Sequence, residues 1–63
     1  MDVKDFKTLR VLFKQDPSMV YESGSFYIDS LNNIHIYHIG KDDVNRESIF
    51  PMEQSRGIVV DYN

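Results

Sequence analysis

The absence of cysteine constrains this chain more than any other feature, because the chain is only 63 residues long. Domains of about this size bury only about 60% of the surface of their unfolded chain, and many of them depend on disulfides, metals or oligomerisation. Without cysteine, a disulfide framework and a thiolate metal site are both excluded. We therefore expect a single domain over residues 1–63 that is stabilised by its own core or by association with another molecule.

The composition excludes further classes of protein. Hydrophobic residues make up 41% of the chain, which is too many for a disordered tail. No apolar run approaches the roughly 20 residues of a membrane span, and no signal-peptide pattern opens the chain. The sequence thus predicts a cytoplasmic protein that has no contact with a membrane.

Residues 2–15 predict an amphipathic helix. Their apolar side chains recur at intervals of three and four residues, and Asp2 is a favourable N-cap. The helix is expected to end at Asp16, because a residue before proline disfavours the helical backbone. Its apolar side would carry Val3, Phe6, Leu9, Leu12 and Phe13, and its basic side Lys4, Lys7 and Lys14, with Arg10 at the margin and Val11 among the lysines.

Residues 18–39 predict a β-hairpin, since they are rich in aromatic and β-branched residues and contain turn-forming residues at 29–33. The register has two alternatives. A two-residue turn at Asn32-Asn33 places Leu31 opposite Ile34, whereas a loop of three or five residues gathers four large apolar side chains on one face. We favour the longer loop for this reason. The four side chains are those of Phe26, Ile28, Ile34 and Ile36.

The remaining segments are shorter. Residues 19–23 are a candidate for a further strand, residues 42–48 for a single helical turn, and Phe50-Pro51 is expected to be extended. Residues 56–62 predict a last strand with Ile58 and Val60 on one face and Val59 and Asp61 on the other. The predicted fold class is α+β, with the N-terminal helix packed on a small antiparallel sheet of three to four strands.

The chain lacks the usual signs of catalysis. His35 and His38 are three residues apart on a predicted strand, so they point to opposite faces and cannot share a metal ion. Neither a nucleophile elbow nor a phosphate-binding glycine loop is present. Asp42-Asp43 fits a solvated loop or a helix cap. We predict that the protein is not an enzyme, with no catalytic, cofactor-binding or metal-binding residues and no small-molecule substrate.

The sheet face away from the predicted helix is the candidate binding surface. It would carry Tyr27, His35, Tyr37 and Ile39, and a domain with one helix has nothing else to cover it. Tyrosine is enriched at protein interfaces, so these four residues are predicted to bind a partner; ordinary exposed residues are an equal alternative. Base stacking on this face is disfavoured, because residues 15–63 carry a formal charge of −5 that repels phosphate.

The leading hypothesis is a small non-enzymatic protein-interaction module, which binds a protein partner or self-associates through this face, an exposed edge strand or its acidic residues. Accessory or inhibitor proteins of phages and mobile elements are often of this type. A minor variant is phosphate mimicry by Asp29, Asp42, Asp43, Glu47 and Asp61. The alternative hypothesis is weak nucleic-acid binding through the basic side of the helix, since residues 1–14 carry a formal charge of +2.

Overall fold

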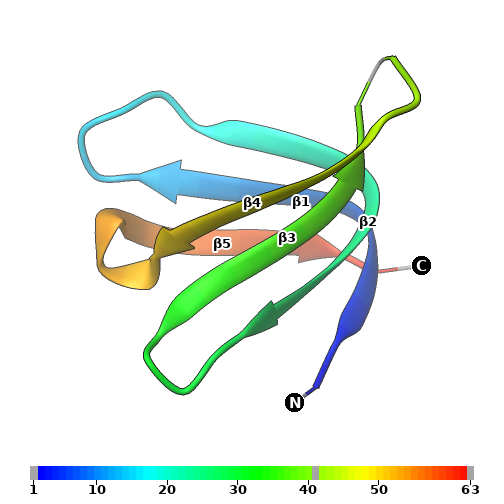
Figure 1. The fold of residues 1–63 in the computed structure, drawn as a ribbon. Helices are drawn as coiled ribbons and strands as arrows, with labels where there is room; N and C mark the ends of the chain where they lie inside the picture. The colour runs from blue at the N-terminus through cyan, green and yellow to red at the C-terminus, as the bar shows by residue number, and fades with distance from the viewer. Residues whose placement is uncertain (1, 41, 63) are drawn as a thin grey trace.

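The protein is an antiparallel five-stranded sheet, which a computed structural model describes over residues 2–40 and 42–62 (Figure 1). The order of the strands in the sheet is β4-β3-β2-β1-β5. A single 3₁₀ turn, η1, precedes the last strand among the described residues. The bounds of the elements are β1 Lys4–Phe13, β2 Met19–Ile28, β3 Asn33–Ile39, β4 Asn45–Pro51, η1 Met52–Gln54 and β5 Ser55–Asp61.

The prediction of an N-terminal helix is wrong, and so is the predicted α+β fold class. Lys4–Phe13 forms strand β1, which pairs with β2 on one side and with β5 on the other. Val11, placed by the helix prediction on the basic side, is fully buried, and Val3 is 58% exposed. The chain therefore folds as an all-β sheet in the part that the structure describes.

A break in the pairing between β1 and β2 explains why β1 resembles a helix in its sequence. The register joins Phe6 to Gly24 and Thr8 to Glu22, but it skips Lys7 and Ser23, and Ser23 adopts a positive φ of 54°. Side chains alternate strictly along a regular strand. Across this break the alternation shifts by one residue, so Phe6 and Leu9 are both buried although they are three residues apart. The resulting i, i+3 spacing imitates helical periodicity.

The core lies inside the curled sheet instead of beneath a helix. The fully buried side chains come from β1 and β3, and half-buried ones from β4, η1 and β5 pack against them. The rings of Phe13 and Phe50 contact each other edge to face, with centroids 5.1 Å apart, although β1 and β4 are not neighbours in the sheet. In Figure 1, β4 crosses in front of β1, in keeping with this contact. The sheet thus covers its own apolar side. The buried residues are Phe6, Leu9, Val11, Tyr21, Phe26, Ile34 and Ile36.

The hairpin of β2 and β3 has the register that the longer loop predicts. Phe26 lies opposite Ile36, and Ile28 lies opposite Ile34. The loop closes through backbone hydrogen bonds from Asp29 to Asn33 and from Asn32 to Asp29. Asn32 takes the left-handed conformation, with a φ of 63°, that asparagine tolerates better than most residues.

The other segments give mixed outcomes. Residues 19–23 are extended as predicted and belong to β2, and Phe50-Pro51 is extended within β4. The predicted helical turn over residues 42–48 is wrong, since Asn45–Pro51 is a strand; residue 41 lies outside the described residues. Strand β4 lies at the edge of the sheet and is largely exposed, so it carries polar residues. For this reason its sequence does not look like a strand. The last strand is confirmed, because Ile58 and Val60 pack against the core and Val59 is exposed.

Candidate functional site

The outer side of β2, β3 and β4 carries a continuous group of aromatic and aliphatic side chains. Tyr27 lies opposite His35 in the pairing of β2 and β3, and His35 lies opposite Ile49 in the pairing of β3 and β4. Tyr37 and Ile39 share this side because they follow His35 at intervals of two residues. We call this surface the aromatic face, and its residues are Tyr27, His35, Tyr37, Ile39 and Ile49.

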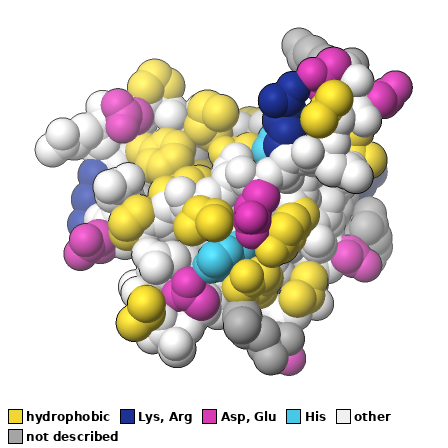
Figure 2. Space-filling view, in the orientation of Figure 1, with side chains coloured by type: hydrophobic (Ala, Val, Ile, Leu, Met, Phe, Trp, Pro, Cys, Tyr) yellow, Lys and Arg dark blue, Asp and Glu magenta, His cyan; other side chains and the backbone are white. Residues whose placement is uncertain are grey.

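The aromatic rings of this face are stacked along the sheet. The rings of Tyr27 and His35 are nearly parallel, with centroids 4.3 Å apart, and those of Tyr27 and Tyr37 are 6.1 Å apart. Tyr37 is 40% exposed, and Ile39 and Ile49 are each more than half exposed. Figure 2 shows a histidine with an acidic side chain on either side and hydrophobic side chains close by. An exposed apolar group rimmed by polar residues is typical of an interaction surface.

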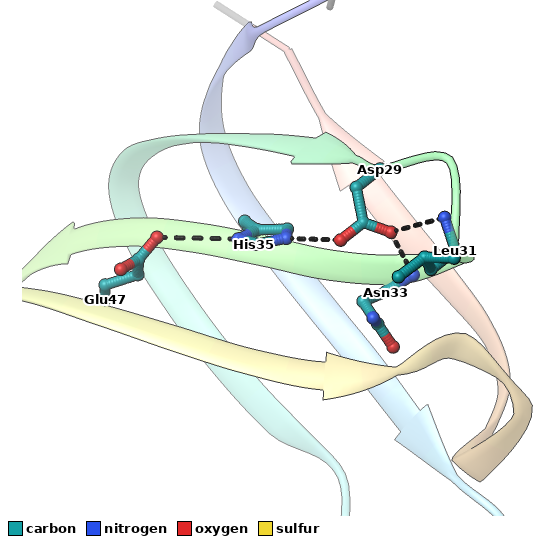
Figure 3. Close-up of polar contacts among 5 residues, drawn as sticks. All are labelled: Asp29, Leu31, Asn33, His35 and Glu47. Atoms are coloured by element: carbon teal, nitrogen blue, oxygen red, sulfur yellow. Dashed lines mark hydrogen bonds and ion pairs between the residues drawn. The ribbon is translucent and has the colours of Figure 1, made fainter.

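His35 lies between two carboxylates (Figure 3). Its Nε2–H donates to Oδ2 of Asp29 at 2.7 Å, and its Nδ1 lies 3.5 Å from Oε2 of Glu47. The second contact is an ion-pair contact and not a hydrogen bond, so the buried Nδ1 has no hydrogen-bond partner among the described residues. A neutral imidazole would turn a lone pair toward Glu47, whereas a protonated one turns an N–H toward it.

The charges around His35 follow from this geometry. The hydrogen bond to Asp29 raises the pKa of His35 above its ordinary value, partial burial opposes the rise, and Glu47 adds to it. The pKa of Asp29 is lowered, first by the hydrogen bond from His35 and then by the backbone N–H of Asn33. The arrangement therefore favours an imidazolium held between two carboxylates.

The loop between β2 and β3 uses Asp29 as its organising residue. Oδ1 of Asp29 accepts hydrogen bonds from the backbone N–H groups of Leu31 and Asn33, both at 2.9 Å. Both oxygens of the carboxylate are thus occupied within the protein, one by the loop and one by His35. Asp29 thus fixes the position of His35 and shapes the loop at the same time.

Glu47 is the more accessible of the two carboxylates. Its side chain is 38% exposed, and it lies opposite Tyr37 in the pairing of β3 and β4. The pKa of the Tyr37 phenol is raised well above its ordinary value, chiefly by the neighbouring Glu47 carboxylate and then by Tyr27. Tyr37 therefore keeps its proton beside the Glu47 carboxylate. This part of the aromatic face presents a carboxylate next to apolar surface.

The four residues that the sequence singled out lie on one side of the sheet, as the hairpin pattern predicted. They are Tyr27, His35, Tyr37 and Ile39. The reason that this side is free differs from the predicted one: the apolar side of the sheet is covered by β1, β5 and η1, not by a helix. A role in binding a partner stays a prediction for all four.

Sequence reasoning missed three residues of this region. Ile49 lies in a segment whose polar composition hid a strand. Asp29 was noted as a turn residue and, like Glu47, as a member of an acidic set, but nothing in the sequence linked either of them to His35. The turn chemistry at 29–33 was a usable signal for Asp29, because an aspartate at the start of a turn often accepts backbone hydrogen bonds.

His38 belongs to the opposite side of the sheet. Its ring contacts that of Tyr21 in the core, with centroids 4.7 Å apart, and its Nε2 lies 3.4 Å from Oγ of Ser48. The two histidines therefore face apart, as predicted. Within residues 2–40 and 42–62, no group of three histidine or acidic residues is arranged to hold a metal ion. Asp42 forms an ion pair with Arg46 instead.

A shallow depression of about 540 Å³ adjoins the aromatic face near the chain reversal between β3 and β4. Its lining includes Tyr37 and Ile39 of the aromatic face, Ser25 and Arg46, and also Phe6 and His38 from the other side of the sheet. A depression next to an apolar surface can receive a single side chain of a binding partner. It lies beside the aromatic face at one end of the strands.

The chain matches no protein-family model, no curated protein and no solved structure. In the part of the chain that the structure describes, no helix is long and apolar enough to cross a membrane. Functional inference therefore rests on the geometry of the aromatic face.

Proposed function

We propose that this protein is a small non-enzymatic interaction module, which binds a protein partner through the aromatic face. The observation that carries the proposal is the grouping of the exposed side chains of Tyr37, Ile39 and Ile49 on β3 and β4. They lie beside the half-buried ring of Tyr27 and next to the Glu47 carboxylate. Tyrosine buries a large area at a low cost in conformational entropy, which suits such a surface to binding.

The chemistry of the face favours a partner with a basic and apolar surface. Glu47 is accessible beside Tyr37, and the chain carries a formal charge of −3. An arginine or lysine side chain would find the Glu47 carboxylate and the exposed ring of Tyr37 next to each other. An acidic partner would be repelled by the same groups.

The other hypotheses have less support. The nucleic-acid alternative loses the helix on which it was based, because Lys4, Lys7 and Arg10 lie on β1. Phosphate mimicry requires a row of free carboxylates, but Asp29 is bound within its loop and Asp42 is paired with Arg46. A phage or mobile-element origin and a cytoplasmic location stay predictions.

A peptide library tests the proposal without knowledge of the natural partner. Random peptides would be selected on the immobilised protein and then compared for binding to the wild type, Tyr37→Ala and Val20→Ser. Val20 is exposed on the first half of β2, outside the aromatic face, so its variant is a matched control. We expect the selected peptides to be enriched in arginine or lysine next to apolar residues, and Tyr37→Ala to weaken them at least about tenfold.

Two outcomes would contradict the proposal. Peptides that bind the wild type and Tyr37→Ala equally, while the far-UV spectra of the two agree, would place the binding surface elsewhere. Binding of generic single-stranded RNA at low salt, with no effect of Tyr37→Ala, would favour the nucleic-acid hypothesis.

A further inference from the structure

The two edges of the sheet differ in how well they are protected against further strand pairing. The free edge of β4 carries Arg46 and Glu47, and it ends at Pro51, which has no backbone N–H to donate. Charges and proline are the usual devices that prevent one edge strand from pairing with another. The β4 edge is therefore protected.

The free edge of β5 lacks these devices over its central residues. Ile58, Val59 and Val60 are consecutive, β-branched and uncharged. The irregularity in β5 is at its start, where the register to β1 shifts and Gly57 takes a positive φ of 149°. The strand order leaves this edge without a neighbour among the described residues. A free and regular stretch of β-branched residues is a template for a further strand.

The side chains of β5 are arranged so that the strand can pair with a copy of itself. Ile58 and Val60 turn toward the core, whereas Val59 is 56% exposed on the outer side, opposite Arg10. In an antiparallel pair centred on Val59, this residue lies opposite Val59 of the second copy, and Ile58 lies opposite Val60. The inward-facing residues of one copy thus lie opposite inward-facing residues of the other copy. A two-fold axis through a continuous sheet requires this arrangement.

The charges at the ends of β5 fit the same register. The pairing places Asp61 of one strand opposite Gly57 of the other, so Arg56 is one position away from Asp61, and the two-fold axis repeats this proximity of opposite charges. Pairing of β5 with the β4 edge of another copy would instead place Val59 among the charged residues and proline of that edge. Self-pairing of β5 is favoured by both the apolar and the charged residues.

We infer that two copies of this chain associate through antiparallel pairing of their β5 strands, centred on Val59, to form a continuous ten-stranded sheet. This interface is separate from the aromatic face, because β5 and β4 lie at opposite edges of the sheet. A single pair of short strands buries less than the roughly 1,200 Å² of a standard interface, so we expect a dissociation constant of about 10–100 µM.

Sedimentation equilibrium tests this inference. The wild type is expected to change from monomer to dimer over a roughly hundredfold range of concentration that ends near 1 mM. Val59→Lys adds a charge at the centre of the edge and is expected to weaken the dimer at least about tenfold, whereas Val59→Thr keeps the β-branched shape and the association. Ile49→Lys on β4 is the matched control: it is expected to impair the aromatic face and leave the dimer unchanged.

A cross-linking experiment gives an independent measurement. Because the chain has no cysteine, Val59→Cys introduces a single thiol. Residues directly opposite in antiparallel strands have Cα atoms about 4.5–5.5 Å apart, within the range that a disulfide bridges. Val59→Cys is therefore expected to form a covalent dimer on oxidation much faster than Ile49→Cys.

Three outcomes would overturn the inference. They are a wild type that stays monomeric throughout this range, a dimer that Val59→Lys leaves intact, and equal rates of cross-linking for the two cysteine variants. Ile49→Lys and Val59→Lys act on different surfaces. Absence of dimerisation therefore would not contradict partner binding through the aromatic face, and absence of partner binding would not contradict dimerisation.

Discussion

His35 and Asp29 are joined across the hairpin of β2 and β3 by a 2.7 Å hydrogen bond from Nε2 to Oδ2. Asp29 also accepts two backbone hydrogen bonds that shape the loop. One carboxylate thus connects the conformation of the loop to the position of an imidazole on the aromatic face. Loop, histidine and binding surface are therefore expected to respond together to pH.

The first prediction concerns the pH dependence of stability. The pKa of His35 is raised above 6.5, so the stability that this residue contributes is complete below about pH 6.5 and is lost as the pH rises through the folded-state pKa. The pKa of Asp29 is lowered below 3.8, so its contribution is complete above about pH 3.8 and is lost as the pH falls through the folded-state pKa. The pair is expected to stabilise the fold most between these two values.

Urea unfolding of the wild type and His35→Gln from about pH 3 to about pH 9 measures this contribution. The free energy of unfolding of the wild type is expected to exceed that of the variant most near pH 5, and the difference is expected to shrink above pH 7. A difference that stays constant across the range would show that the protonation of His35 does not contribute to stability.

The second prediction separates the two roles of Asp29. Asp29→Asn keeps an oxygen that can accept from Leu31 and Asn33 but removes the negative charge beside His35. Its loop is expected to persist, while the pKa of His35 falls toward 6.5. Asp29→Ala loses both roles and is expected to be the less stable of the two variants. Proton NMR titration of His35 and thermal unfolding measure the two effects, and equal stabilities would mean that the loop does not depend on this acceptor.

The hairpin was predictable because its information is local. The residues that set its register, Phe26, Ile28, Ile34 and Ile36, lie close together in the chain on either side of the turn. Their alternation identifies both faces of the hairpin. The grouping of Tyr27, His35 and Tyr37 on the outer face follows from this alternation alone.

Strand β1 was not predictable in the same way. Its sequence spacing depends on the break in pairing at Lys7 and Ser23, and this break exists only when β1 and β2 are side by side. The contact of His35 with Glu47 has the same character, because it requires the pairing of β3 with an edge strand that is polar in sequence. Long-range pairing, and not local propensity, determines both features.

The third prediction concerns Gly24, where β2 and β3 approach closely. A Cβ atom at this position would lie 2.1 Å from the backbone oxygen of Tyr37 and 3.0 Å from the ring of Phe6. Gly24→Ala is therefore expected to displace the two strands and to lower the free energy of unfolding by about 1–3 kcal/mol. The same displacement is expected to disturb Tyr37 on the aromatic face.

Gly40→Ala is the matched control for this change. Its Cβ would lie 2.9 Å from the side chains of Arg46 and Asp42, which are exposed and able to move. Its free energy of unfolding is expected to stay within about 0.5 kcal/mol of the wild type. Equal losses in the two variants, measured by urea unfolding, would show that the approach of β2 to Tyr37 is not a tight constraint.

The fourth prediction tests whether the sheet closes its own core. The edge-to-face contact of Phe13 with Phe50, at 5.1 Å, joins β1 to β4 across the interior. Aromatic pairs of this geometry contribute about 0.5–1.5 kcal/mol beyond the area that they bury. A double-mutant cycle of Phe13→Leu and Phe50→Leu is therefore expected to give a coupling energy in this range.

The control cycle combines Phe13→Leu with Ile28→Val. Ile28 is 42% exposed at the end of β2 next to the Asp29–Asn33 loop, so these two substitutions are expected to be additive within about 0.3–0.5 kcal/mol. Coupling in the first cycle and additivity in the second would place β4 over β1, as the curled sheet requires. Additivity in both cycles would mean that β4 lies apart from β1 and that the apolar side of the sheet is covered in another way.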